Sequence, residues 1–193
     1  IARDIRKALP NSTRIVSNTD ESECLEFIPT KMTGRYRAVT DDFALGNTLN
    51  FVALDPSFHM FGLNNELPAD QRIEGGDWVA VYNLGPHPVL KLNGTSWTSD
   101  TPNTDADAYT RANISKVSGV SNDAVRHEAT ISFLEPKIFP LASGSKRFYV
   151  IPKDENIVAY MCDDSGNLRR TTRDFGDTDA LSDHCGGPDE DIL

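Results

Sequence analysis

The chain has 193 residues, which fits one domain or two very small ones. Its formal net charge of −10 argues against a site for nucleic acid phosphate or an anionic membrane surface, because both attract basic surfaces. The hydrophobic fraction of 38% predicts a folded core rather than disorder, and no run of the sequence approaches the roughly 18 apolar residues of a membrane span.

Residues 1–9 are predicted to form an amphipathic helix. Ile1, Ile5 and Leu9 recur at four-residue spacing and place one apolar face on it, and Pro10 ends it. A helix of this length is not stable alone, so this face must pack on something. No capping residue precedes Ile1, and we interpret the segment as the end of a longer helix that begins upstream.

The rest of the chain reads almost entirely as short strands. The expected strands share β-branched or alternating apolar residues bounded by turn residues. They are residues 13–17, 24–28, 36–40, 50–54, 77–84, 89–92, 125–134, 147–151, 157–162 and 168–173. The last three are expected to form a meander, and residues 93–108 a long polar loop. The predicted fold class is α+β, with a short helix over residues 1–10 and a β-rich, mostly antiparallel globular domain over residues 11–193.

Three cysteines, Cys24, Cys162 and Cys185, match no zinc-binding spacing and form no Cys-x-x-Cys pair. Two interpretations stay open from spacing alone. Two cysteines in strand-like segments fit one structural disulfide in an oxidising compartment, with one thiol left over. The alternative is three reduced thiols in a reducing compartment.

No arrangement of residues indicates catalysis, a cofactor or a metal. The four histidines never stand at helical spacing, and no nucleophile, phosphate-loop or dinucleotide motif occurs. Two acidic loops, one with Asp100, Asp105 and Asp107 and one with Asp177, Asp179 and Asp183, lack the glycine and terminal glutamate of a calcium loop. We interpret both as solvated loops and predict that the protein is not an enzyme.

Six blocks of sequence, in order, carry a family resemblance. They are RDIRKALPNSTRI at 3–15, CLEFIP at 24–29, VAVYNLG at 79–85, ADAYTRANIS at 106–115, FPLASGSKRFYVI at 139–151, and a strand ending in Cys162 that returns through GNLRR at 166–170. This series resembles the MshO-like minor pilins of the mannose-sensitive haemagglutinin (MSHA) type IV pilus. More distantly, it resembles the J-type pseudopilins of type II secretion.

The resemblance implies a pilin-like fold, with the end of a long N-terminal helix at residues 1–10 and a globular head at 11–193. It also implies a disulfide between Cys24 and Cys162, and contact of Ile1, Ile5 and Leu9 with partner helices. An apolar helix upstream of Ile1 would anchor the subunit in the inner membrane, with the head on the periplasmic side, before assembly into the surface pilus.

The function that the resemblance implies is initiation of pilus assembly at the tip, with the other minor pilins and the major pilin as partners and no cofactor. Two alternatives remain open. One is a type II secretion pseudopilin. The other is a pilus-tip adhesin that binds surface glycans, for which Trp97, in the polar loop, is the best sugar-stacking residue.

Overall fold

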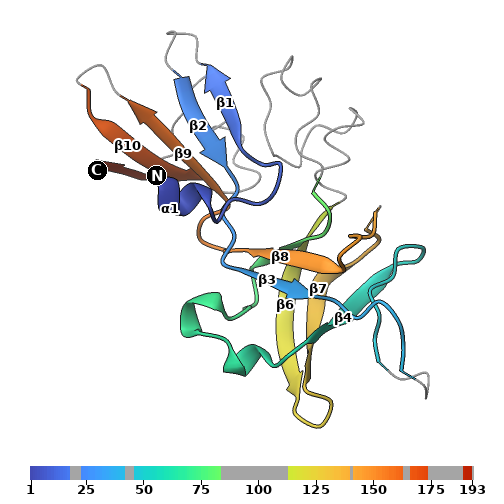
Figure 1. Cartoon of the computed structure of the whole chain (residues 1–193). Helices are drawn as coiled ribbons and strands as arrows, with labels where there is room; N and C mark the ends of the chain where they lie inside the picture. Colours follow the sequence, from blue (N-terminus) through green and yellow to red (C-terminus); the bar gives the residue numbers. More distant parts are fainter. Residues whose placement is uncertain are drawn as a thin grey trace. The chain divides into compact units, whose positions relative to one another are not determined.

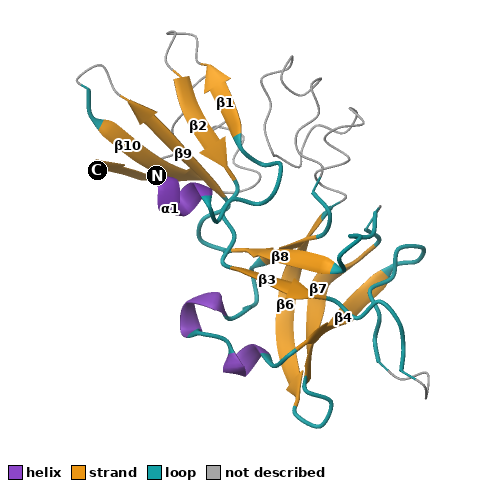
Figure 2. Cartoon of the chain, viewed as in Figure 1, coloured by secondary structure: helices purple, strands orange, loops and turns teal. Residues whose placement is uncertain are grey.

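The structure is a computed structural model, and it describes residues 1–17, 23–41, 46–83, 113–139, 141–162, 166–173 and 189–192. These residues form a mostly antiparallel β-sheet fold with little helix (Figures 1 and 2). The chain divides into two compact units. The first contains residues 1–30, 83–111 and 154–193, and the second contains residues 31–82 and 112–153.

The first unit is built around one antiparallel sheet in the order β1-β2-β9-β10-β11. Its strands are β1 (Arg14–Ser17), β2 (Glu23–Phe27), β9 (Ile157–Cys162), β10 (Leu168–Arg173) and β11 (Asp189–Ile192). The central pair, β2 and β9, comes from opposite ends of the sequence. Cys24 lies opposite Met161, and Phe27 lies opposite Val158. One short helix, α1 (Ala2–Ile5), belongs to the same unit.

The second unit is an antiparallel sheet in the order β3-β8-β5-β6-β7-β4. Its strands are β3 (Met32–Arg35), β4 (Asp55–Phe61), β5 (Trp78–Ala80), β6 (Ile114–Asp123), β7 (Glu128–Lys137) and β8 (Arg147–Ile151), with two 3₁₀ turns, η1 (Asn64–Glu66) and η2 (Ala69–Gln71).

The two outer strands of this second sheet meet each other. Tyr36, directly after β3, forms a β-bridge with Met60 of β4, and the Arg37 N–H donates to the His59 carbonyl oxygen at 2.8 Å. The sheet therefore curls toward a small closed barrel, which leaves few unpaired edge groups. Its core is aromatic: the rings of Phe58 and Phe148 pack edge to face, with centroids 5.3 Å apart.

Two buried carboxylates of the second unit have ion-pair and hydrogen-bond partners. The Asp77 side chain is completely buried and pairs with Lys31 Nζ at 2.7 Å, while it accepts the backbone N–H groups of Glu74 at 2.7 Å and Lys153 at 3.1 Å. Glu128 pairs with the Arg37 guanidinium and with His59 Nδ1, the latter at 3.1 Å. Such partners are what make a buried charge tolerable.

The strongest strand predictions are confirmed. The expected bounds of β8, β9 and β10 are those observed, and β1 and β2 agree within one residue. The antiparallel pairing of β9 with β10 is also as expected.

The predicted meander is wrong in its first strand, because β8 pairs with β3 and β5 of the second unit. The strands expected at 36–40 and 50–54 do not form, and the one at 77–84 is limited to β5. The expectation of a strand at 89–92 lies outside the described residues.

The N-terminal helix is shorter than predicted. It ends at Ile5, and residues 7–9 run alongside residues 28–30 instead. The Leu9 N–H donates to the Ile28 carbonyl and the Thr30 N–H to the Lys7 carbonyl, both at 2.7 Å. These hydrogen bonds between two segments of the same chain replace the helical ones that residues 7–9 would otherwise make. Among the described residues, no helix has the length and apolar character needed to span a membrane.

A cross-strand glycine gives a direct test of the barrel core. Gly34 of β3 lies opposite the fully buried Phe148, and a Cβ at this position would lie 2.6 Å from the ring. We expect Gly34→Ala to lower the free energy of unfolding by about 1–3 kcal/mol, because the buried Phe148 ring, which packs edge to face on Phe58, would have to shift. The measurement is urea denaturation followed by fluorescence.

The matched control is Gly119→Ala on β6, where an added Cβ meets no atom within 4 Å. That variant should unfold within about 0.5 kcal/mol of the parent protein. Equal losses in the two variants would contradict the packing of Gly34 against Phe148.

Candidate interaction surface

One face of the first unit's sheet is apolar. In the ladder, Leu25 lies opposite both Ile15 and Tyr160, and Phe27 lies opposite Val158. Since side chains of directly paired residues project from the same face, these five side chains form one continuous surface. The Phe27 and Tyr160 rings are stacked with centroids 6.2 Å apart. We call this surface the apolar face.

The segment around α1 covers part of the apolar face. Ile5 and Ala8 pack against the buried cluster of Phe27, Val158 and Tyr160. This burial, rather than intrinsic helix propensity, stabilises a helix of only four residues, because so short a helix is unstable in water.

A polar anchor fixes α1 in this position. The Tyr160 hydroxyl donates to Asp4 Oδ2 at 2.5 Å, and Arg170 Nε of β10 lies 3.7 Å from the same oxygen. Arg170 is itself held by Glu155 at 2.9 Å. The hydrogen bond from Tyr160 lowers the pKa of Asp4, while burial, with the Asp4 contact, raises the pKa of Tyr160. The anchor is therefore a neutral phenol that donates to an ionised carboxylate.

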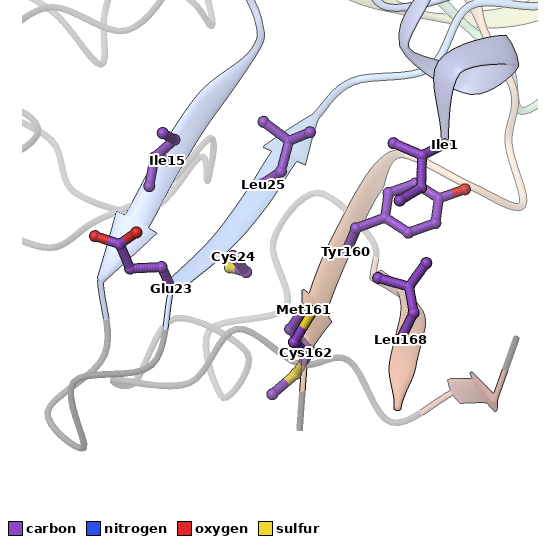
Figure 3. A pocket seen from close by; sticks show the side chains of 9 residues that line it. All are labelled: Ile1, Ile15, Glu23, Cys24, Leu25, Tyr160, Met161, Cys162 and Leu168. Carbon is purple, nitrogen blue, oxygen red and sulfur yellow. The ribbon is translucent and has the colours of Figure 1, made fainter. Parts of the chain in front are cut away.

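The remainder of the apolar face forms an open groove of about 390 Å³ (Figure 3). It lies between Ile1 at the start of α1 and Ile15 on β1, and these two side chains are 47% and 64% exposed. Its lining residues are Ile1, Ile15, Glu23, Cys24, Leu25, Tyr160, Met161, Cys162 and Leu168. We refer to it as the groove.

The chemistry of the groove favours apolar contact. Four of the nine described residues that line it are aliphatic, and Glu23 is the one carboxylate among these nine. In the described part of the chain, no three His, Cys, Asp or Glu side chains are grouped so that they could hold a metal ion. Large exposed apolar patches are found at sites that bind proteins, membranes or small ligands.

The predicted disulfide between Cys24 and Cys162 is wrong. Cys24 is buried and disulfide-bonded, whereas Cys162 is an exposed free thiol. The register explains the difference. Cys24 lies opposite Met161, so the next residue on β9, Cys162, projects from the other face of the sheet. The third cysteine, Cys185, lies outside the described residues.

The three predicted partner-contact residues lie in three different environments. Ile1 lines the groove, Ile5 packs on the apolar face, and Leu9 is only 1% exposed, so its side chain cannot contact a partner. Arg3 and Arg6 are exposed. Trp97 and both acidic loops lie outside the described residues.

Sequence reasoning missed the groove residues Ile15, Leu25 and Leu168. Each lies in a correctly predicted strand, and the available signal was their apolar character at positions that the alternation places on one face. Pairing register was the missing information, because it decides which of these strands share a face.

Comparisons of the chain with protein-family models, with curated proteins and with solved structures found no significant match.

The anchor predicts a sensitivity to acid. The pKa of Asp4 is lowered in the folded protein, so its contribution to stability is present above the unfolded pKa near 3.8 and is lost as pH falls through the lower folded value. We expect Asp4→Asn to flatten the pH dependence of the unfolding midpoint below about pH 4. The measurement is thermal unfolding followed by circular dichroism across that range.

The companion variant is Tyr160→Phe, which keeps the ring and removes the donor. It should lose about 1 kcal/mol of stability at neutral pH, since water competes for the partly exposed Asp4 carboxylate. An unchanged acid profile in both variants would contradict the anchor.

The cysteine assignment predicts a definite peptide map. Because Cys24 is disulfide-bonded and Cys162 is a free, exposed thiol, we expect Cys162 to react with an alkylating agent without reduction and Cys24 to react only after it. Proteolysis and mass spectrometry of alkylated samples, with and without reduction, measure the two reactivities. A cross-linked peptide that contains Cys162 would contradict this assignment.

Proposed function

We propose that this chain is a non-enzymatic minor pilin subunit of an MSHA-like type IV pilus that takes part in initiating assembly at the tip. The observation that carries the proposal is the apolar face, on which α1 is docked while a groove beside it remains open to water. A subunit that assembles by packing helices on its head needs such a surface.

The sequence supports the same proposal independently. The ordered blocks at 3–15, 24–29, 79–85, 106–115 and 139–151 resemble the corresponding blocks of MshO-like minor pilins. The proposed fold is pilin-like and α+β, with α1 as the end of a longer helix. That arrangement is supported by the packing of Ile5 on an antiparallel sheet.

The proposal also includes where the subunit lies in the cell before and after it enters the pilus. An apolar helix upstream of Ile1 would hold the subunit in the inner membrane, with the head on the periplasmic side, until it enters the pilus. The disulfide at Cys24 supports an oxidising compartment of this kind, since structural disulfides persist there and are rare in the cytosol. Partners would be the other minor pilins and the major pilin.

Deletion of the gene tests the assembly role. We expect surface pili to be lost or strongly reduced while the major pilin remains in the membrane fraction, because initiation rather than subunit supply is removed. Electron microscopy of whole cells and immunoblots of sheared and membrane fractions measure the two quantities. Complementation with the complete gene is the control.

Two outcomes would overturn this role. Normal pili with lost adhesion would favour the glycan-binding adhesin, and a Trp97→Ala variant would then be tested on immobilised glycans. Normal pili with lost protein secretion would favour the pseudopilin of type II secretion.

A further inference from the structure

A lysine and a buried carboxyl group meet at one end of the second unit's sheet. Lys31 directly precedes β3, and Asp77 directly precedes β5. Both strands pair with β8 in the antiparallel sense, on either side of Val150, so they begin at the same end of the sheet. At that end, Lys31 Nζ lies 2.7 Å from Asp77 Oδ2.

The Asp77 carboxyl group is withdrawn from water and held by the backbone. Its side chain has no exposed surface, and the Lys31 side chain is 16% exposed. The Glu74 N–H donates to Oδ2 at 2.7 Å, and the Lys153 N–H donates to Oδ1 at 3.1 Å. Each carboxyl oxygen therefore has a fixed donor, and the lysine nitrogen faces the same group at hydrogen-bond distance.

This arrangement suits attack of the amine on the carboxyl carbon. Burial makes separated charges costly, which favours transfer of a proton from the Lys31 ammonium to the Asp77 carboxylate. The resulting neutral amine is a nucleophile, and backbone N–H groups on the carboxyl oxygens stabilise the negative charge that develops during attack. Because the fold holds both groups in contact, the reaction is intramolecular, which removes much of its entropic cost.

We propose that Lys31 and Asp77 join in an intramolecular isopeptide bond once the second unit has folded. The neutral Nζ attacks Cγ of the carboxylic acid, and the Lys153 N–H holds the oxyanion at Oδ1. The Nζ–Cγ bond forms and the Cγ–Oδ2 bond breaks. Oδ2 leaves as water with two protons that began on the ammonium group, and no other reactant is consumed. This inference goes beyond the proposed function and does not depend on it.

A neighbouring pair provides an internal comparison. Lys153 Nζ lies 2.9 Å from Glu74 Oε2, at nearly the same distance as the Lys31 pair, but its side chains are 41% and 55% exposed. Water solvates both charged groups there, so this pair stays ionic. Burial, rather than distance, distinguishes the two pairs.

Intact-mass spectrometry of the whole chain tests the proposal. The protein is reduced and denatured first, so that neither a disulfide nor bound water affects the mass. We expect a mass lower than that of the sequence by one water molecule. Tandem mass spectrometry of a tryptic digest should place this loss in two joined peptides, one with Lys31 and one with Asp77, without cleavage after Lys31.

The variant Lys31→Arg assigns the bond. Arginine keeps the positive charge and can pair with Asp77, but its guanidinium stays protonated and does not attack, so this variant should have the full sequence mass. Lys153→Arg is the matched control, and it should still lose one water molecule. Lys31→Arg should also have the lower thermal midpoint of the two, because a cross-link restricts the unfolded chain as a disulfide does.

A parent chain with the full sequence mass would overturn the inference, and Lys31 and Asp77 would then form only an ion pair. Loss of water that persists in Lys31→Arg, or that maps to other residues, would overturn it as well. The mass of the parent chain decides the question even if Lys31→Arg fails to fold.

Discussion

An antiparallel sheet with one apolar face has to remove that face from water, and this constraint organises the first unit. Burial of apolar surface contributes about 25 cal/mol per Å², so an uncovered face is costly. Here α1 supplies part of the cover, and the hydrogen bond from Tyr160 to Asp4 fixes where that cover lies. The rest of the face is the groove, at which Ile15 is 64% exposed.

The second unit meets the same constraint differently. Its sheet curls until β3 and β4 meet at the Tyr36–Met60 bridge, so its apolar side chains face one another inside. The Glu128 carboxylate holds this closure, because its partners Arg37 and His59 lie on the two segments that meet. One chain thus contains a sheet whose apolar side chains pack against one another and a sheet whose apolar face is covered only in part by the α1 segment.

The local sequence pattern was sufficient to predict strands that are short, alternating and bounded by clear turns, as at 157–162 and 168–173. It failed to predict segments whose structure is decided by residues that are distant in the sequence. Residues 7–9 have a helical pattern, yet the backbone of residues 28–30 offers them better hydrogen bonds. The prediction of the disulfide failed for a related reason. Strand positions for Cys24 and Cys162 were right, but a one-residue difference in register places their side chains on opposite faces.

Each unit joins segments that lie far apart in the sequence. The central pair of the first unit, β2 and β9, joins residues 24 and 161, and closing so long a loop in an unfolded chain is entropically costly. Within the second unit, the buried Asp77 binds both the Lys31 side chain and the Lys153 backbone N–H, and these are the first and last residues of that unit. The Lys31 N–H also donates to the Val150 carbonyl at 2.9 Å. The fully buried Asp77 therefore holds together the first and last segments of the second unit, at residues 31 and 153.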